Sequence, residues 1–232
     1  MLFLSSCEQD LDTEGVSRIT NYPTMELIGE SNVFLEVGET YTDEGVIAKE
    51  GEDEIDVLVK YNSGEYYGES TLNTDVPDKY AITYIAENAD GIKLESNLRN
   101  VWVFNTGDLV NSIEGLYVSN VKRGTADFSG DLKYVLISKT GDNTYEITHA
   151  IGGHYSIGLG YGSDYAARGA IITANDISSN DFSISQAVFP LWGNVVDITD
   201  FTVDASAKTI SFVGNGDFAN SMFTVNLTQV QP

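Results

Sequence analysis

A short glycine-rich stretch between residues 152 and 168 holds the side chains best suited to contact a ligand. Glycines let a backbone approach a bound molecule closely, and exposed aromatic rings can pack against sugar rings. Trp192, in the loop that follows Pro190, could add a second aromatic surface. The candidate ligand-binding residues are His154, Tyr155, Tyr161, Tyr165, Arg168 and Trp192. The alternative interpretation is that these aromatic rings cap and fill the end of a domain.

The sequence offers few residues for catalysis. His149 and His154 are the only histidines, and the chain has no H-E-x-x-H motif, nucleophile elbow or Cys–His arrangement. His149 shares one face of a predicted strand with Tyr145 and Ile147, which favours a buried core histidine. The Gly-x-Gly-x-Gly run at 158–162 lacks the spacing of a nucleotide-binding loop. We therefore predict that the chain is not an enzyme and uses no cofactor.

Acidic residues dominate the chain, with 35 acidic against 12 basic side chains and a net charge of −23. Such a surface repels phosphate backbones and anionic lipid head groups, so nucleic acid is not expected as a partner. The densest acidic cluster covers residues 50–56. It could bind calcium, which takes six to eight oxygen ligands, or it could be a solvated loop. We predict no metal site, and calcium binding at 50–56 stays open.

The amino-terminal segment Leu4-Ser5-Ser6-Cys7 resembles a bacterial lipobox, in which small residues precede the lipidated cysteine. The acidic stretch 8–14 resembles the export signal of Bacteroidetes lipoproteins that reach the outer cell surface. These resemblances imply a lipid anchor on Cys7 and a surface-exposed location at the outer membrane. Residues 1–22 are interpreted as a truncated signal, lipobox and tether, because only six residues precede Cys7 and none is basic. We expect the full signal to begin upstream or to have been trimmed.

No apolar run in the sequence reaches the 18–20 residues that a membrane-spanning helix needs. The lipid anchor is therefore the expected membrane attachment. Beyond residue 7 the chain has no cysteine, so the domains must be held by core packing without a disulfide.

Residues 23–104 alternate apolar and polar side chains in short runs, as strands do. Tyr80, Ile82 and Tyr84 with Ala86 fall on one face of a strand, and Asn97 to Phe104 forms the last strand of this region. Helical periodicity is absent. Several short strands at regular spacing indicate an immunoglobulin-like β-sandwich.

Two motifs in this region resemble bacterial immunoglobulin-like domains of the type repeated in a pesticidal crystal protein. The segment 37–46 is similar to their "VGxxYxDxGV" motif, and within residues 79–84 Tyr80 and Tyr84 have the spacing of the two tyrosines in "GxYxxxY". Such domains act as spacers or adhesive modules. The resemblance therefore implies presentation of a neighbouring domain rather than catalysis.

Residues 105–111 form a polar break that we interpret as a linker, and 112–232 form a second domain. Turn signals separate eight predicted strands, at 115–121, 133–138, 144–150, 169–174, 182–188, 197–203, 209–213 and 222–229. Eight antiparallel strands in up-and-down order close into a small β-barrel. The spacing is compatible with a calycin-like barrel, and the domain resembles the carboxy-terminal half of uncharacterised Bacteroidetes lipoproteins.

The sequence thus predicts an all-β protein, with an immunoglobulin-like sandwich followed by a small antiparallel barrel. Its expected function is that of a non-catalytic surface lipoprotein that binds an extracellular polymer such as a glycan, or an envelope protein. The alternative is a structural or scaffold subunit of a cell-envelope complex with no small-molecule site. Ligand binding predicts that the tyrosines and Trp192 are exposed together, whereas a scaffold predicts that they are buried.

Overall fold

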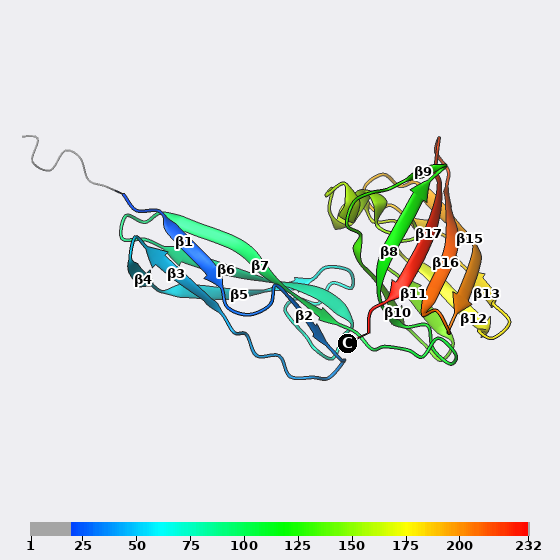
Figure 1. Cartoon of the computed structure of the whole chain (residues 1–232), viewed down its shortest axis with the longest axis horizontal. Coiled ribbons are helices and arrows are strands. Elements are labelled where there is room, and N and C mark those ends of the chain that lie inside the picture. Colours follow the sequence, from blue (N-terminus) through cyan, green and yellow to red (C-terminus); the bar gives the residue numbers. More distant parts are fainter. Residues whose placement is uncertain (1–19, 232) are drawn as a thin grey trace, which may run out of the picture.

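The computed structural model describes residues 20–231, which form two all-β domains joined end to end (Figure 1). The first described residues lie at the end of the first domain that is farthest from the second (Figure 1). Cys7 and the acidic stretch 8–14 lie outside the described residues. Within residues 20–231, no helix is long and apolar enough to cross a membrane.

The first domain is a sandwich of two sheets. The smaller sheet contains β1 (Pro23–Leu27), β3 (Val46–Glu50) and β4 (Asp53–Ile55). The larger sheet has the order β2 (Asn32–Leu35), β7 (Lys93–Val103), β6 (Asp78–Glu87) and β5 (Val57–Gly64). Strand β2 runs parallel to β7, and the other pairs are antiparallel.

The core of the sandwich follows the alternation of its two longest strands. Tyr80, Ile82 and Tyr84 of β6 are fully buried, as are Val101 and Val103 of β7. The face predicted for residues 80–86 is therefore the core face. Burying these apolar side chains supplies the main favourable free energy for folding the domain.

The second domain is built from one long antiparallel sheet. Its strands are β8 (Gly115–Arg123), β9 (Ala126–Asp127), β10 (Lys133–Lys139), β11 (Thr144–Ile147), β12 (Ala170–Asp176), β13 (Asp181–Ile184), β14 (Ala187–Val188), β15 (Val195–Asp204), β16 (Thr209–Gly216) and β17 (Met222–Gln229). Apart from the short β9, which pairs with β8, the sheet order is β13-β12-β11-β10-β8-β17-β16-β15-β14. Each of the eight predicted strands has a counterpart. The short β9 was not predicted, β11 ends three residues before the predicted strand 144–150, and β13 and β14 split the predicted strand 182–188.

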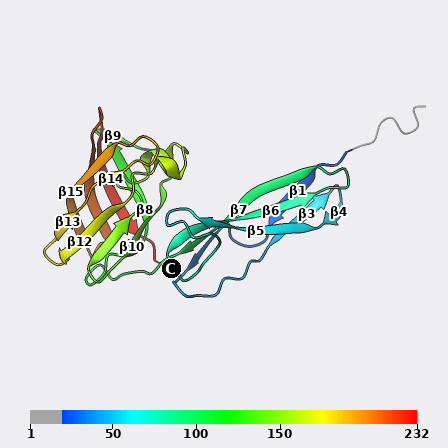
Figure 2. The same cartoon turned by 180° about the vertical axis from the view of Figure 1, so that it is seen from behind.

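The sheet curls on itself (Figure 2). The end strands β13 and β14 are consecutive pieces of the same stretch of chain. Val188 of β14 pairs with Val195 of β15 and also bridges Arg168, just before β12. Strand β13 pairs with β12, and β14 pairs with β15. The interrupted strand β13–β14 therefore joins the two edges of the sheet and closes the barrel. The prediction of an all-β chain that ends in a small antiparallel barrel is confirmed.

The barrel interior is packed with apolar side chains. Tyr117, Ile172, Phe212 and Val225 belong to one buried cluster that spans most of the barrel strands. Strand β16 continues to Gly216, three residues beyond the end of the predicted strand 209–213. The only helical segments in residues 20–231 are a π-helical turn at His154–Gly158 and a 3-10 turn at Ser163–Tyr165. Both lie in the long β11–β12 connection.

Candidate functional site

The β11–β12 connection lies at the upper end of the barrel as it is drawn in Figure 1. Gly152 enters the barrel mouth with a φ of 64°. A Cβ atom at Gly152 would lie 2.5 Å from Ser119 Oγ and 2.6 Å from Val121 Cγ2. Only glycine fits there, since both the space and the left-handed backbone exclude a side chain. The connection is thereby fixed on the barrel before it reaches the predicted site residues.

Four of the predicted site residues form one cluster of rings, here called the aromatic platform: Tyr155, Tyr161, Tyr165 and Trp192. The ring of Trp192 lies 5.1 Å from Tyr155 and 4.9 Å from Tyr165. Tyr161 lies 5.2 Å from Tyr165 and stacks over Tyr155 at 6.3 Å. Residues from two separate loops therefore meet at one place.

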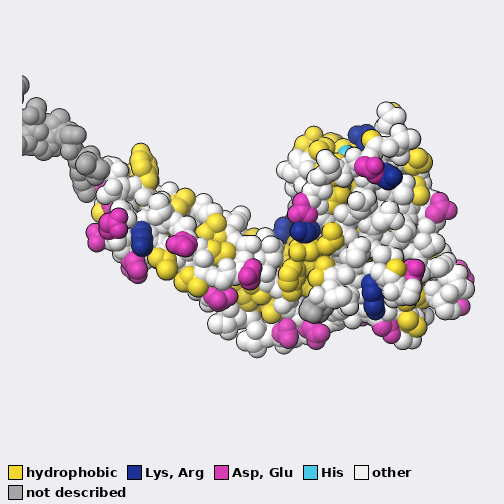
Figure 3. All heavy atoms as spheres, in the orientation of Figure 1, with side chains coloured by type: hydrophobic (Ala, Val, Ile, Leu, Met, Phe, Trp, Pro, Cys, Tyr) yellow, Lys and Arg dark blue, Asp and Glu magenta, His cyan; other side chains and the backbone are white. Residues whose placement is uncertain are grey.

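The platform has a buried base and an exposed surface. Tyr155 is buried against Phe189 and Phe223. Tyr161 is 51% exposed and Trp192 is 44% exposed. Figure 3 shows hydrophobic side chains gathered at this end of the barrel. Large aromatic rings that stay in water while packed on a fixed base are typical of binding surfaces.

His154 lies beneath the platform rather than on its surface. It is buried, and its ring is in contact with those of Phe128, Tyr155 and Phe223. Burial and the nearby charge of Arg123 lower its pKa. His154 is therefore neutral near pH 7 and supports the platform from below.

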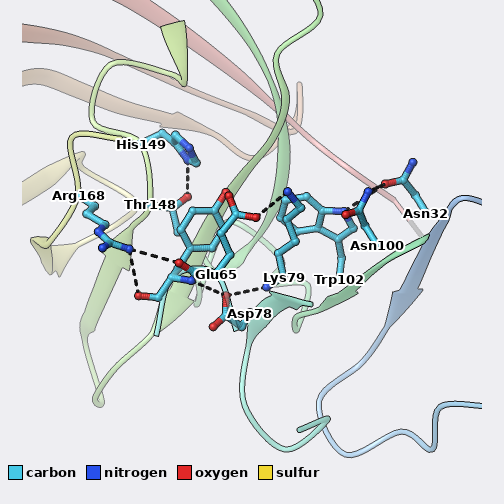
Figure 4. A network of polar contacts seen from close by, with 10 residues as sticks. Asn32, Glu65, Asp78, Lys79, Asn100, Trp102, Thr148, His149 and Arg168 are labelled. Atoms are coloured by element: carbon cyan, nitrogen blue, oxygen red, sulfur yellow. Dashed lines mark hydrogen bonds and ion pairs between the residues drawn. The ribbon is translucent and has the colours of Figure 1, made fainter. Parts of the chain in front are cut away.

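Arg168 points toward the first domain (Figure 4). Its Nη1 atom lies 3.4 Å from the backbone oxygens of Glu65 and Tyr66. The backbone of Arg168 pairs with that of Val188 and so fixes the residue at the edge of the barrel. The structure thus brings four of the six predicted ligand-binding residues onto one surface and places His154 and Arg168 elsewhere.

A polar groove lies beside the platform and was not predicted from the sequence. We call it the Arg123 groove; its lining includes Arg123, Thr125, Asn215, Asn220, Ser221 and Met222. The guanidinium carbon of Arg123 lies 5.5 Å from the ring centres of Tyr155 and Phe223. In the sequence, the one signal for this groove is that Arg123 ends an apolar strand.

The junction between the domains is a second organised region. Leu116 and Leu136 lie on the outer face of the barrel, and both are buried together with Trp102 and Phe104 of the first domain. Tyr134 contacts the rings of Trp102 at 5.3 Å and Phe34 at 5.5 Å. Where they meet the first domain, strands β8 and β10 are therefore apolar on both faces, because one face fills the barrel and the other packs on the first domain.

The β5–β6 loop fastens this junction (Figure 4). The buried carboxylate of Asp78 accepts hydrogen bonds of 2.9 Å from the backbone N–H groups of Tyr66 and Tyr67. The hydroxyl of Tyr67 lies 3.2 Å from Ser138 Oγ on β10. Because Asp78 fixes the loop backbone, both tyrosines are held in position against the barrel.

His149 also belongs to the junction. It is buried, as expected from its place beside Tyr145 and Ile147, but it contacts Tyr66 at 5.4 Å and lies outside the barrel core. Its Nδ1 atom lies 2.7 Å from Thr148 Oγ1. Burial, with smaller contributions from Lys79 and Arg168, lowers the pKa of His149 to about 3.

This lowered pKa predicts a dependence of stability on pH. The unfolded chain binds a proton at His149 near pH 6.5, whereas the folded chain does so only near pH 3. The free energy of unfolding should therefore fall as pH drops from about 7 to 5, with a slope of up to about 1.4 kcal/mol per pH unit from this residue. Denaturant unfolding of a His149→Gln variant should show a shallower fall than that of the native sequence.

Comparing the native chain with His149→Gln also controls for other groups that titrate between pH 7 and pH 5. Burial raises the pKa of Asp78 and Glu146, so their contribution runs in the opposite direction, with stability lost as pH rises. Both carboxyls are present in the native chain and in His149→Gln, so their contributions cancel in the difference between the two pH slopes. Equal slopes for the native chain and His149→Gln would contradict the assignment.

The acidic cluster 50–56 lies at the hairpin that joins β3 to β4. The carboxylate of Glu50 accepts a hydrogen bond of 2.9 Å from the backbone of Ala89. Across residues 20–231, no group of three or more His, Cys, Asp or Glu side chains is arranged to hold a metal ion. Calcium binding at this loop stays an untested possibility of the sequence.

Comparisons with known proteins match both halves of the chain. A family model of a C-terminal domain matches residues 106–229, and the bacterial surface protein Ig-like domain matches residues 25–103. The crystal structure of the lipoprotein BT2262 from Bacteroides thetaiotaomicron is 24% identical, with a TM-score of 0.66, over 90% of this chain and 100% of that chain. A search of curated proteins finds no match.

These matches confirm the predicted Ig-like domain and the two-domain organisation. The solved structure shows that the same fold occurs in a Bacteroides protein. Neither family description names an enzyme, and the description of the N-terminal domain indicates the cell envelope.

Proposed function

The chain belongs to the family defined by this C-terminal domain, here joined to a bacterial surface Ig-like domain, and we propose that it is a lipid-anchored surface lipoprotein that binds an extracellular glycan. In this proposal the first domain is a stalk and the barrel is the binding domain. The barrel's up-and-down strand order supports a calycin-like classification. The protein acts without catalysis and contacts the membrane only through its anchor.

The aromatic platform is the observation that carries this proposal. Tyr161 and Trp192 are exposed side by side on the buried ring of Tyr155. Tyrosine and tryptophan combine an apolar ring with a polar atom, which suits the apolar faces and hydroxyl groups of sugar rings. Because Gly152 and Tyr155 fix the loop on the barrel, little conformational entropy is lost when a ligand binds.

The arrangement of the domains supports presentation at a surface. The chain enters the first domain at the end farthest from the barrel (Figure 1). An anchor on Cys7 would therefore hold the barrel away from the membrane by the length of the sandwich. The acidic stretch 8–14 supports export to the outer face of the outer membrane.

The lipid anchor gives a direct prediction. In a bacterial host that expresses the full gene, labelled palmitate should enter the native protein but not a Cys7→Ala variant, because the thiol carries the lipid. The variant should leave the membrane fraction. A Ser6→Ala variant keeps a small residue before the cysteine and should be labelled normally. Label in the Cys7→Ala protein would contradict the anchor.

Removal of the platform rings should weaken glycan binding. Trp192→Ala and Tyr161→Ala should each reduce the affinity for a bound polysaccharide about tenfold or more, as at the central residues of other interfaces. Calorimetric titration against a polysaccharide panel measures the loss. Tyr22→Ala is the matched control, because Tyr22 is exposed in the first domain and remote from the barrel. Unchanged affinity in both platform variants would contradict the proposed site.

A scaffold subunit is the second candidate. The observation that favours it is the 66% exposed Leu58 on β5, an edge strand whose backbone could pair with another protein. In that case Leu58→Lys would remove the protein from its envelope complex, while the platform variants would leave the complex intact.

A further inference from the structure

The Arg123 groove lies directly beside the aromatic platform. Arg123 contacts the ring of Tyr155, which in turn contacts Trp192 at 5.1 Å. The side chain of Asn194, from the loop of Trp192, donates a hydrogen bond of 2.8 Å to Asp217 in the β16–β17 turn. The platform and the groove are therefore in contact through Tyr155, close enough for one polymer to bind both.

The guanidinium of Arg123 is held in place. Its Nε atom donates a hydrogen bond of 2.9 Å to the backbone oxygen of Asn220. The planes of Tyr155 and Phe223 lie against it at 5.5 Å. These contacts fix one edge of the guanidinium and leave the N–H groups of its other two nitrogens for a ligand.

Arg123 forms no ion pair with any acidic side chain of residues 20–231. The other groups that line the groove are uncharged, with hydroxyls from Thr125 and Ser221 and amides from Asn215 and Asn220. By contrast, Arg99 pairs with Asp43 and Arg168 faces backbone oxygens. Arg123 is thus a fixed guanidinium without an ion-pair partner that lines a groove of otherwise uncharged groups.

We propose that the Arg123 groove binds the anionic group of an acidic sugar, a carboxylate or a sulfate, while the platform stacks on a neighbouring sugar ring. This inference rests on the proposed glycan-binding function and names its substrate class. A planar guanidinium matches a carboxylate or sulfate with two parallel hydrogen bonds. The amides and hydroxyls of the groove then bind sugar hydroxyls.

The acidic surface sharpens this selectivity. Repulsion from distant carboxylates is screened beyond about 8 Å at physiological ionic strength, whereas the contact with Arg123 is direct. An anionic polymer therefore gains binding only where its charge meets the guanidinium. Anionic groups elsewhere along the polymer meet an acidic surface and gain nothing.

The test compares ligands that differ only in charge. Oligomers of polygalacturonate are titrated against the native protein before and after complete methyl esterification, and sulfated dextran oligomers are compared with plain dextran. The native protein should bind the charged member of at least one pair about tenfold more tightly or better. The pair that shows the preference identifies the anion as carboxylate or sulfate. Because this comparison uses no variant, it does not depend on a substitution being tolerated.

Two variants then locate the preference. Arg123→Gln should bind the charged and neutral members with equal affinity. Lys139→Gln removes one exposed positive charge at the opposite end of the barrel and should keep the preference. Melting curves confirm that both variants are folded.

The outcomes separate this inference from the function on which it rests. If neutral members bind as tightly as charged ones, or Arg123→Gln keeps the preference, the acidic-sugar subsite is wrong, while binding that depends on Trp192 still supports a glycan-binding barrel. If no polysaccharide of either charge binds, both the subsite and the proposed function are wrong.

Discussion

A Trp102→Ala variant is expected to lose about 3–5 kcal/mol of unfolding free energy, as for other large buried aromatic residues. Trp102 is 3% exposed and packs against Tyr134 of the barrel. Lys79 lies 5.5 Å from its ring centre, and the indole Nε1 lies 3.4 Å from Asn32 Oδ1. Truncation removes all these contacts and leaves a cavity between the domains.

The same variant should also uncouple the two domains. The native chain should unfold in one calorimetric transition, because separation of the domains would expose Leu116 and Leu136 to water. In Trp102→Ala the transition should split in two. Trp192→Ala is the matched control, since it removes the same side chain from a half-exposed position and should cost less. Equal losses in the two variants, or one sharp transition in Trp102→Ala, would show that the junction contributes little to stability.

An Arg99→Met variant should destabilise the first domain by about 3–5 kcal/mol, because it leaves the buried carboxylate of Asp43 without its ion-pair partner. The guanidinium also donates hydrogen bonds to the backbone oxygens of Ile28 and Glu30. Burial alone would raise the pKa of Asp43, but hydrogen bonds from Tyr84 and Tyr41 and the charge of Arg99 lower it overall. This pair therefore stabilises the folded state at neutral pH, and that stability is lost as pH falls below the ordinary pKa of an aspartate.

Chemical denaturation of the Arg99→Met protein measures this effect. Lys93→Met provides the control, because Lys93 forms an exposed ion pair with Glu87 and such pairs contribute at most about 1 kcal/mol. A double variant, Arg99→Met with Asp43→Asn, should recover part of the lost stability since no buried charge remains. If Arg99→Met and Lys93→Met lose similar stability, the buried pair is not a major determinant of the sandwich.

The strands were predictable from the sequence because each depends on local alternation. Tyr80, Ile82 and Tyr84 repeat at a period of two, and all three are fully buried on β6. The barrel strands followed from similar patterns and from the turn signals between them. The split between β13 and β14 was missed, because it depends on how Val188 meets Arg168 when the barrel closes.

The site was only partly predictable because proximity in sequence is a poor guide to direction. Arg168 is three residues from Tyr165, yet it faces the first domain. Arg123 is remote in sequence but reaches Tyr155, since β8 ends at the same barrel mouth as the β11–β12 connection. The junction was missed for a related reason: nothing in the local pattern of Tyr134 and Leu136 reveals that another domain covers them.

Acrylamide quenching of tryptophan fluorescence tests the platform most directly. The chain has two tryptophans, and Trp102 is buried whereas Trp192 is exposed. Quenching therefore reports on Trp192. A polysaccharide that stacks on the platform should reduce the quenching of the native protein and should have no such effect on Trp192→Phe. If bound polysaccharide leaves Trp192 as accessible to acrylamide as it is in the free protein, the platform is not the glycan-binding surface.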